Sequence, residues 1–274
     1  MKTSKKLIER LKSKALEARK KIVVCSSNAK LEHIGSAFSE IDVLTVLYHA
    51  ILRISSEKPN NPNRDRFILS KGHGALGLYV LLEQRGFISK KELDEYGNDG
   101  TKLAGHPVYK SAPGIEFSTG SLGHGLSVGV GLALSAKSDN KKWRTFVFLS
   151  DGECNEGSVW EAIFLAGHLG LDNLVAIIDK NKIQSLGKTK DILNMEPFSE
   201  KWKNASWEVR EIDGHNFEQI IKVFSTIPAK KKKPTVIIAN TIKGKGLPYM
   251  ENMISSHYSL IQKDKLEETL KNLY

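Results

Sequence analysis

The second half of the chain alternates short apolar runs with helical segments, and this alternation restricts the possible folds more than any other feature. Three runs of strand length are almost uninterrupted in their apolar character: Thr145 to Leu149, Leu174 to Ile178 and Thr235 to Ala239. Such runs predict strands that are buried on both faces, and helices between them predict parallel pairing. We therefore expect an α/β fold with a doubly wound, mostly parallel sheet and helices on both faces.

The other expected elements follow from the same periodicities. Residues 1–60 are expected to be helical, with a buried helix from Ile41 to Ile54, and residues 98–124 are expected to form a loop. Two further strands are expected at Arg66 to Ser70 and Val209 to Ile212. Further helices are expected at Ala75 to Gly86, Leu126 to Ser138, about Glu156 to Leu169, and Phe217 to Thr226. No internal repeat or low-complexity linker divides the sequence, so we expect one domain over residues 1–274.

Composition places the chain among ordinary globular proteins. Of its 274 residues, 40% are hydrophobic and 26% are charged, which excludes collagen, disordered chains and disulfide scaffolds. The two cysteines, Cys25 and Cys154, form no CxxC pair, so neither a disulfide framework nor a zinc site is expected. No apolar stretch approaches the length of about 18 residues that spans a membrane, and the N-terminus lacks a secretory core. We expect a cytoplasmic protein with no membrane partner.

The net charge of +10 favours anionic partners. The basic residues are scattered along the sequence, and the run Lys230 to Lys233 lies between Pro228 and Pro234. In many surfaces that bind nucleic acids, aromatic side chains are interleaved with the basic ones. This run contains no aromatic side chain. We interpret the run as a solvated loop and expect no nucleic-acid partner.

Two polar segments directly follow two consecutive strands of the expected sheet. Ser150-Asp151-Gly152 follows the first strand, and Asp179-Lys180-Asn181 follows the next. Ligands of such sheets bind outside the carboxyl ends of the strands, and a helix expected to begin near Glu156 directs its positive end toward the same crevice. A carboxylate and an amide oxygen suit Mg²⁺ or Ca²⁺ bound to a diphosphate. Alternatively, Asp151 caps the following helix.

Several histidines lie in glycine-containing segments: His33, His73, His106 and His124. Glycine lets the backbone approach a ligand closely, and imidazole can donate, accept or transfer a proton. The spacing of metal-binding histidines, such as HExxH, is absent from the sequence, so a histidine zinc site is not expected. The alternative for each of these residues is a hydrogen-bonded loop anchor.

Together these segments resemble the thiamine-diphosphate-binding half of transketolase. The diphosphate motif of that family begins with Gly-Asp-Gly and closes with asparagine about thirty residues later. Here it corresponds to Ser150 to Gly157 and Asp179 to Ile183, with Ser150 in place of the first glycine. Other matching segments follow in family order: His33-Ile34-Gly35-Ser36, Leu69 to His73, Gly105-His106-Pro107 and Thr119 to Gly125. The resemblance covers almost the entire chain.

This resemblance implies thiamine diphosphate and Mg²⁺ (or Ca²⁺) as cofactors. The metal ligands that it implies are Asp151, the Asn181 side chain and the Ile183 backbone carbonyl. The residues that it places at the diphosphate are Gly152, His73 and Asn181, and the segment beside the aminopyrimidine is Gly120-Ser121-Leu122.

The resemblance also implies catalytic roles. His33 and His106 would face the thiazolium carbon and the sugar hydroxyls. Glu156 matches a glutamate in a hydrogen-bond path that joins two active sites, although an acid in a first helical turn is also favoured by the helix dipole alone. His257 matches a later histidine near the diphosphate and the substrate. His124 stands where the family often has glutamine, so it is left outside the predicted site.

The full family chain carries two further domains, and one of them supplies the glutamate that activates the aminopyrimidine. This sequence ends at Tyr274, after the first domain. We therefore expect the N-terminal subunit of a split transketolase, active only with a separate C-terminal subunit. It would transfer a two-carbon ketol unit from a ketose or ketose phosphate to an aldose. We expect a two-plus-two heterotetramer with the helix Leu126 to Ser138 near the contact.

Two alternatives remain at this point. A deoxyxylulose-phosphate-synthase-like or 2-oxo-acid dehydrogenase-like subunit would keep the pair Asp151 and Asn181, but not the same series of loop histidines. A basic binding or scaffold protein that merely retains the fold would be expected to lose ligand residues, and the matched ones are all present. The sequence does not specify the sugars.

Overall fold

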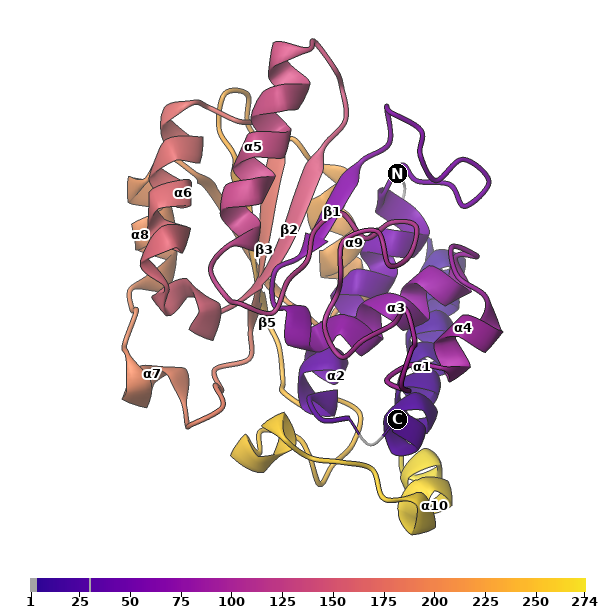
Figure 1. Cartoon of the computed structure of the whole chain (residues 1–274). Coiled ribbons are helices and arrows are strands. Elements are labelled where there is room, and N and C mark those ends of the chain that lie inside the picture. Colours follow the sequence, from indigo (N-terminus) through magenta and orange to yellow (C-terminus); the bar gives the residue numbers. More distant parts are fainter. Residues whose placement is uncertain (1–3, 30) are drawn as a thin grey trace.

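The computed structural model describes residues 4–29 and 31–274, and a parallel sheet lies at its centre (Figure 1). In the described part the sheet has five strands in the order β1-β2-β3-β5-β4, and all neighbours pair in parallel. The strands are β1 (Arg66–Leu69), β2 (Thr145–Ser150), β3 (Leu174–Lys180), β4 (Glu208–Asp213) and β5 (Thr235–Asn240). All carboxyl ends therefore lie at one edge of the sheet, and the expected α/β fold is confirmed.

Helices cover both faces of this sheet. They are α1 (Lys5–Ala29), α2 (Ile34–Val46), α3 (Ala75–Gln84), α4 (Lys90–Asp94), α5 (Gly125–Ser138), α6 (Gly157–His168), α7 (Thr189–Ile192), α8 (Phe198–Asn204), α9 (Phe217–Ser225) and α10 (Leu266–Lys271). Helices α5, α6 and α8 lie on one side, and α1, α2, α3 and α9 lie on the other (Figure 1). The two layers of helices explain why the strand sequences are apolar on both faces.

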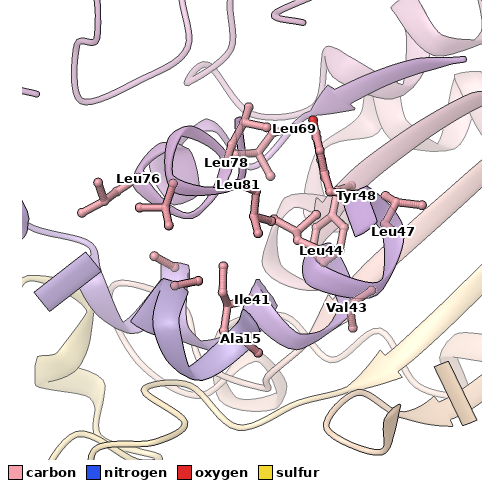
Figure 2. Close-up of a cluster of buried hydrophobic side chains, with 14 of the residues drawn as sticks. Ala15, Ile41, Val43, Leu44, Leu47, Tyr48, Leu69, Leu76, Leu78 and Leu81 are labelled. Atoms are coloured by element: carbon pink, nitrogen blue, oxygen red, sulfur yellow. The ribbon is translucent and has the colours of Figure 1, made fainter. Parts of the chain in front are cut away.

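The alternation along β2 shows how the sheet divides the core. Phe146 and Phe148 belong to the larger buried cluster, with α1, α2, α3 and α9, whereas Val147 and Leu149 belong to the cluster under α5, α6 and α8. Successive strand residues point to opposite faces, so one strand supplies both cores. In the larger cluster, side chains of α2 and α3 pack against each other (Figure 2).

The helix expected from Ile41 to Ile54 has different bounds. Helix α2 begins at Ile34, and a π-helical turn, Leu47–Ile51, follows it before Leu52 adopts an extended conformation. The window Ile34–Ile51 has a mean hydropathy of 1.2, which is enough by length and composition alone to cross a membrane. However, it includes Glu40 and Asp42, and 83% of it is buried inside the protein. It forms the core helix under the sheet.

The other expected strands and helices agree with the structure to within two residues at each end, but the helical region expected over residues 1–60 ends at Ile51, and residues 52–60 form no helix. Helix α3 ends at Gln84 because Gly86, two residues further on, has a φ of 75°, which closes a helix. The loop expected at residues 98–124 is confirmed. The short helices α4, α7, α8 and α10 were not expected. Residues 1–3 and 30, part of the expected helical region, lie outside the described residues.

Candidate active site

The carboxyl edge of the sheet brings polar segments together. Lys71 follows β1, Asp151 follows β2, Asn181 follows β3, and Lys243 lies shortly after β5. A cavity of about 370 Å³ opens at this edge. Its lining includes the predicted site residues His73, Leu122, Gly152, Glu156, Asn181, Ile183 and His257. The structure therefore joins segments that lie more than one hundred residues apart in the sequence.

The other predicted site residues lie outside the lining of this cavity: His33, His106, Gly120, Ser121 and Asp151. Two of them are joined to it through a histidine cluster, which consists of His33, His73, His106 and His257. The ring centroid of His33 lies 5.0 Å from that of His257, 5.5 Å from that of His73 and 6.1 Å from that of His106. Four separate segments thus present imidazoles at one place.

Hydrogen bonds fix the tautomers of two rings in the histidine cluster. His33 Nδ1 donates to the carbonyl oxygen of His257 at 3.0 Å, so Nε2 of the neutral ring carries no proton. Nδ1 of His257 accepts from Lys243 Nζ at 2.7 Å, so Nε2 of that ring carries the proton. The His33 ring is therefore prepared to accept a proton and the His257 ring to donate a hydrogen bond.

Desolvation keeps these rings neutral. Burial lowers the pKa of His33 and of His73, and in His73 the nearby charge of Lys71 adds to this effect. Burial, together with the ammonium group of Lys243, lowers the pKa of His257 to about 3. Partial burial also lowers the pKa of His106. Neutral imidazoles can either donate or accept hydrogen bonds, as groups that handle sugar hydroxyls must.

The three predicted metal ligands lie on two segments that a hydrogen bond joins. The carboxylate of Asp151 accepts from the backbone N–H of Lys182 at 2.7 Å and of Gly152 at 2.9 Å. Oδ1 of Asn181 accepts from the backbone N–H of Ile183 at 3.1 Å. The Ile183 carbonyl accepts from Lys243 Nζ at 3.3 Å. Hence each of the three oxygens is held by a hydrogen-bond donor, and the bond from Lys182 to Asp151 joins the end of β2 to the segment that contains Asn181 and Ile183.

The donor set fits a cation that binds a diphosphate. A carboxylate, an amide and a backbone carbonyl are the hard oxygen ligands that Mg²⁺ and Ca²⁺ prefer. Burial raises the pKa of Asp151 to about 7, and the charge of Asp179 acts in the same direction; a bound dication would favour the ionised carboxylate. Cysteine, histidine and acidic side chains alone form no metal cluster among the described residues, so the amide and the carbonyl are essential to this set.

Two features of the cavity wall bear on ligand binding. At Gly152 a Cβ atom would lie 2.7 Å from Cγ of Gln184, which also lines the cavity, so the packing of Gln184 favours glycine at this position. Ser36 also lines the cavity, and its buried hydroxyl has no hydrogen-bond partner among the described residues. An unpaired buried hydroxyl costs free energy unless a ligand or water satisfies it.

Beneath the cavity lies an ionic cluster of Glu40, Lys71 and Asp179, which was not predicted from the sequence. All three side chains are fully buried, and Lys71 Nζ lies 3.0 Å from Glu40 Oε2 and 2.5 Å from Asp179 Oδ2. Asp179 also accepts from the Asn181 amide at 3.1 Å. The cluster therefore orients Asn181 from below.

Lys243 is another site residue that was not predicted from the sequence. It is 1% exposed, and burial together with the charge of Lys71 lowers its pKa to about 8. A signal was present, because Lys243 follows the buried strand Thr235–Asn240 by three residues. The rule that ligands bind at carboxyl ends of strands applies to β5 as it does to β2 and β3.

The family model described as "Transketolase, thiamine diphosphate binding domain" matches residues 12–274. The chain belongs to the transketolase family. An apulose-4-phosphate transketolase subunit of Phocaeicola vulgatus is 42% identical, over 97% of this chain and 94% of that protein. The 6-deoxy-6-sulfo-D-fructose transketolase subunit of a Clostridium species is 40% identical, over 82% of each chain.

Solved transketolases share the fold over a longer chain. The transketolase of Leishmania mexicana superposes with a TM-score of 0.89 at 29% identity, over 96% of this chain and 40% of that one. Human transketolase is 35% identical over 97% of this chain and 42% of its own length. This chain thus spans about two fifths of these transketolases. It is the counterpart of their N-terminal part and, over nearly full length, of the Phocaeicola protein.

The substitution Glu40→Gln tests the charge state of the ionic cluster. Burial raises the pKa of Glu40 from 4.5 to about 8, so the folded protein keeps a proton that the unfolded chain has lost. The contribution of Glu40 to stability is therefore complete below about pH 4.5 and declines as the pH rises toward 8. Glutamine does not titrate, so the variant should gain stability relative to the wild type over this window.

We expect this relative gain to reach as much as about 1.4 kcal/mol per pH unit. Urea unfolding of both proteins at about pH 5.5, 6.5 and 7.5 measures it. Glu218→Gln, at an exposed position on α9, is the control for the removal of one carboxylate, and the pH dependence of Glu40→Gln is measured relative to it. A constant difference for Glu40→Gln would contradict the assignment.

Proposed function

We propose that this chain is the cofactor-binding subunit of a two-chain transketolase that transfers a two-carbon ketol unit from a ketose or ketose phosphate to an aldose. The observation that carries the proposal is the cavity at the sheet edge, where Gly152, Asn181 and Ile183 meet the histidine cluster. Relatives of matching length are named transketolase subunits, which supports a separate partner subunit.

Thiamine diphosphate supplies the carbanion chemistry that carries the two-carbon unit. In this proposal, Asp151, Asn181 and the Ile183 carbonyl hold Mg²⁺, or Ca²⁺ in its place. Gly152, His73 and Asn181 contact the diphosphate, with Lys243 as an additional positive charge. All four of these residues lie in the cavity wall, and this position, together with the hydrogen-bonded oxygens of Asp151 and Asn181, supports the placement. Gly120, Ser121 and Leu122 lie beside the aminopyrimidine, and this is supported by Leu122 in the cavity wall.

The histidines handle the protons and oxygen atoms of the sugar. His33 Nε2, which lacks a proton in the neutral ring, accepts one from a substrate hydroxyl. His257 Nε2 donates to a substrate or phosphate oxygen. His106, at the outer side of the cluster, binds a sugar hydroxyl. The lowered pKa values support these roles, because a protonated ring could not act as the acceptor.

The partner subunit covers the open side of the site in this proposal. Ile192, Leu193 and Tyr258 line the cavity and are exposed, as is Phe164 on α6, which is 61% exposed. Exposed apolar side chains next to a site mark surfaces that bind other proteins. We propose a two-plus-two heterotetramer with α5 and α6 near the contact. Glu156, exposed at the cavity rim, then belongs to the path that joins two active sites.

We expect Asp151→Ala and Asn181→Ala each to weaken the Mg²⁺-dependent binding of thiamine diphosphate by at least tenfold. Each variant removes an oxygen ligand from a cation that neutralises the diphosphate. Isothermal titration with thiamine diphosphate, with and without Mg²⁺, measures the effect, and circular dichroism verifies the fold. Unchanged affinity in both folded variants would refute this metal site.

The chain alone, saturated with thiamine diphosphate and Mg²⁺, should have no transketolase activity. The aminopyrimidine needs a carboxylate partner, whereas Asp151 is engaged by two backbone N–H groups in this chain. Turnover is followed while increasing amounts of a C-terminal partner are added to a fixed amount of this chain. A plateau near an equimolar ratio is expected, and full turnover without the partner would overturn the two-chain proposal.

A further inference from the structure

Glu153 is a buried acid at the centre of the site. Its side chain is inaccessible to solvent, and its carboxylate accepts hydrogen bonds from three separate segments. The donors are the hydroxyl of Ser70 after β1, the backbone N–H of Gly123 at 3.0 Å and the backbone N–H of Ser150 at the end of β2, at 3.3 Å. We call these four residues the Glu153 clasp. Burial of a carboxylate is costly unless such donors satisfy it.

The clasp also explains the unusual first residue of the diphosphate motif. Ser150 stands where the transketolase motif has glycine, and its hydroxyl accepts from the backbone N–H of Glu153 at 3.1 Å. Ser150 therefore bonds to Glu153 in both directions, through its backbone N–H and through its hydroxyl. The serine and the glutamate act as one unit in this chain.

Gly123 is held by the clasp on one side and by α6 on the other. Its N–H donates to Glu153, and its carbonyl accepts from the Ser158 hydroxyl at 2.9 Å. Its φ of 87° favours glycine, and a Cβ atom there would lie 2.7 Å from Cβ of Glu156. Gly123 is thus held from two sides, and at the other end of segment 119–124 the N–H of Thr119 donates to the Pro107 carbonyl at 3.1 Å.

The anchored segment shapes the uncharged part of the cavity. Leu122 contributes an apolar side chain to the wall, and the segment packs against His106, because a Cβ atom on Gly120 would lie 2.8 Å from Cδ2 of His106. The polar end of the cavity is held separately, by the bonds of Asp151 to Lys182 and of Asn181 to Ile183. The two ends of the cavity therefore depend mainly on different hydrogen bonds, and the link between them is the 3.3 Å bond from the Ser150 N–H, next to Asp151, to Glu153.

We propose that Glu153 is a positioning residue that sets segment 119–124 for the ring end of the cofactor and acts far less on the diphosphate end. Glu153 acts through Gly123, not through a bond to the cofactor. This inference rests on the proposed function, because it takes thiamine diphosphate as the ligand. In the protein without ligand, the clasp should protect the Gly123 amide from hydrogen exchange.

Binding of two probes in the presence of Mg²⁺ separates the ends of the cavity. Glu153→Leu removes the acceptor, so we expect the Kd of thiamine diphosphate to rise at least tenfold, while the Kd of inorganic pyrophosphate changes less than twofold. Glu153→Gln keeps one oxygen that can accept from Ser70 and Gly123, so it should restore binding to within about threefold of the wild type. Asp151→Ala should weaken the binding of both probes, and the exposed control Glu218→Gln should change the Kd of neither.

The proposal would be overturned if Glu153→Leu lost the same factor of affinity for both probes, or lost affinity for neither. Hydrogen exchange of the wild-type chain provides a second test that needs neither a variant nor a ligand. The Gly123 amide should exchange as slowly as amides of the sheet, and rapid exchange there would overturn the proposal even if Glu153→Leu fails to fold. If the wild type binds neither probe while Gly123 is protected, the proposed function fails but the clasp stands.

Discussion

The buried ammonium group of Lys71 is the interaction on which the site depends. It lies between Glu40 and Asp179, whose side chains are also fully buried, and removal of the Asp179 carboxylate would leave an uncompensated charge in the interior. Asp179 in turn bonds to Asn181, and Asn181 bonds to the backbone of Ile183. Lys71 also joins the segment after β1 to the end of β3, so one charge fixes the spacing of two strand ends.

A parallel sheet makes this arrangement useful for binding. The carboxyl ends of its strands place polar residues at a single edge. At this edge the buried ionic cluster lies beneath the cavity, and the histidine cluster lies beside it. The neutral state of these imidazoles and the raised pKa of Asp151 have the same main cause, which is desolvation. In the proposed function, the anionic cofactor and its cation would replace part of the water that these groups have lost.

The sequence predicted the sheet and the pair Asp151 and Asn181 because both depend on local patterns: apolar runs and the residues that end them. It did not predict the roles of Lys71, Lys243 or Glu153, because these depend on contacts between distant segments; the Lys71–Asp179 bond joins residues 108 positions apart. One missed element did carry a local signal. Ser89 and Glu92 form a capping box that begins α4, and the S-x-x-E pattern is readable in the sequence.

An experimental structure of the chain with thiamine diphosphate and Mg²⁺ tests the central claim most directly. The account predicts electron density for the cation in contact with Asp151, the Asn181 side chain and the Ile183 carbonyl, and for the diphosphate beside Gly152. The protein has another cavity of about 570 Å³, lined by residues of α1, α4 and α10, which serves as an internal comparison. Cofactor density in that cavity, or a cation away from Asp151 and Asn181, would contradict the account.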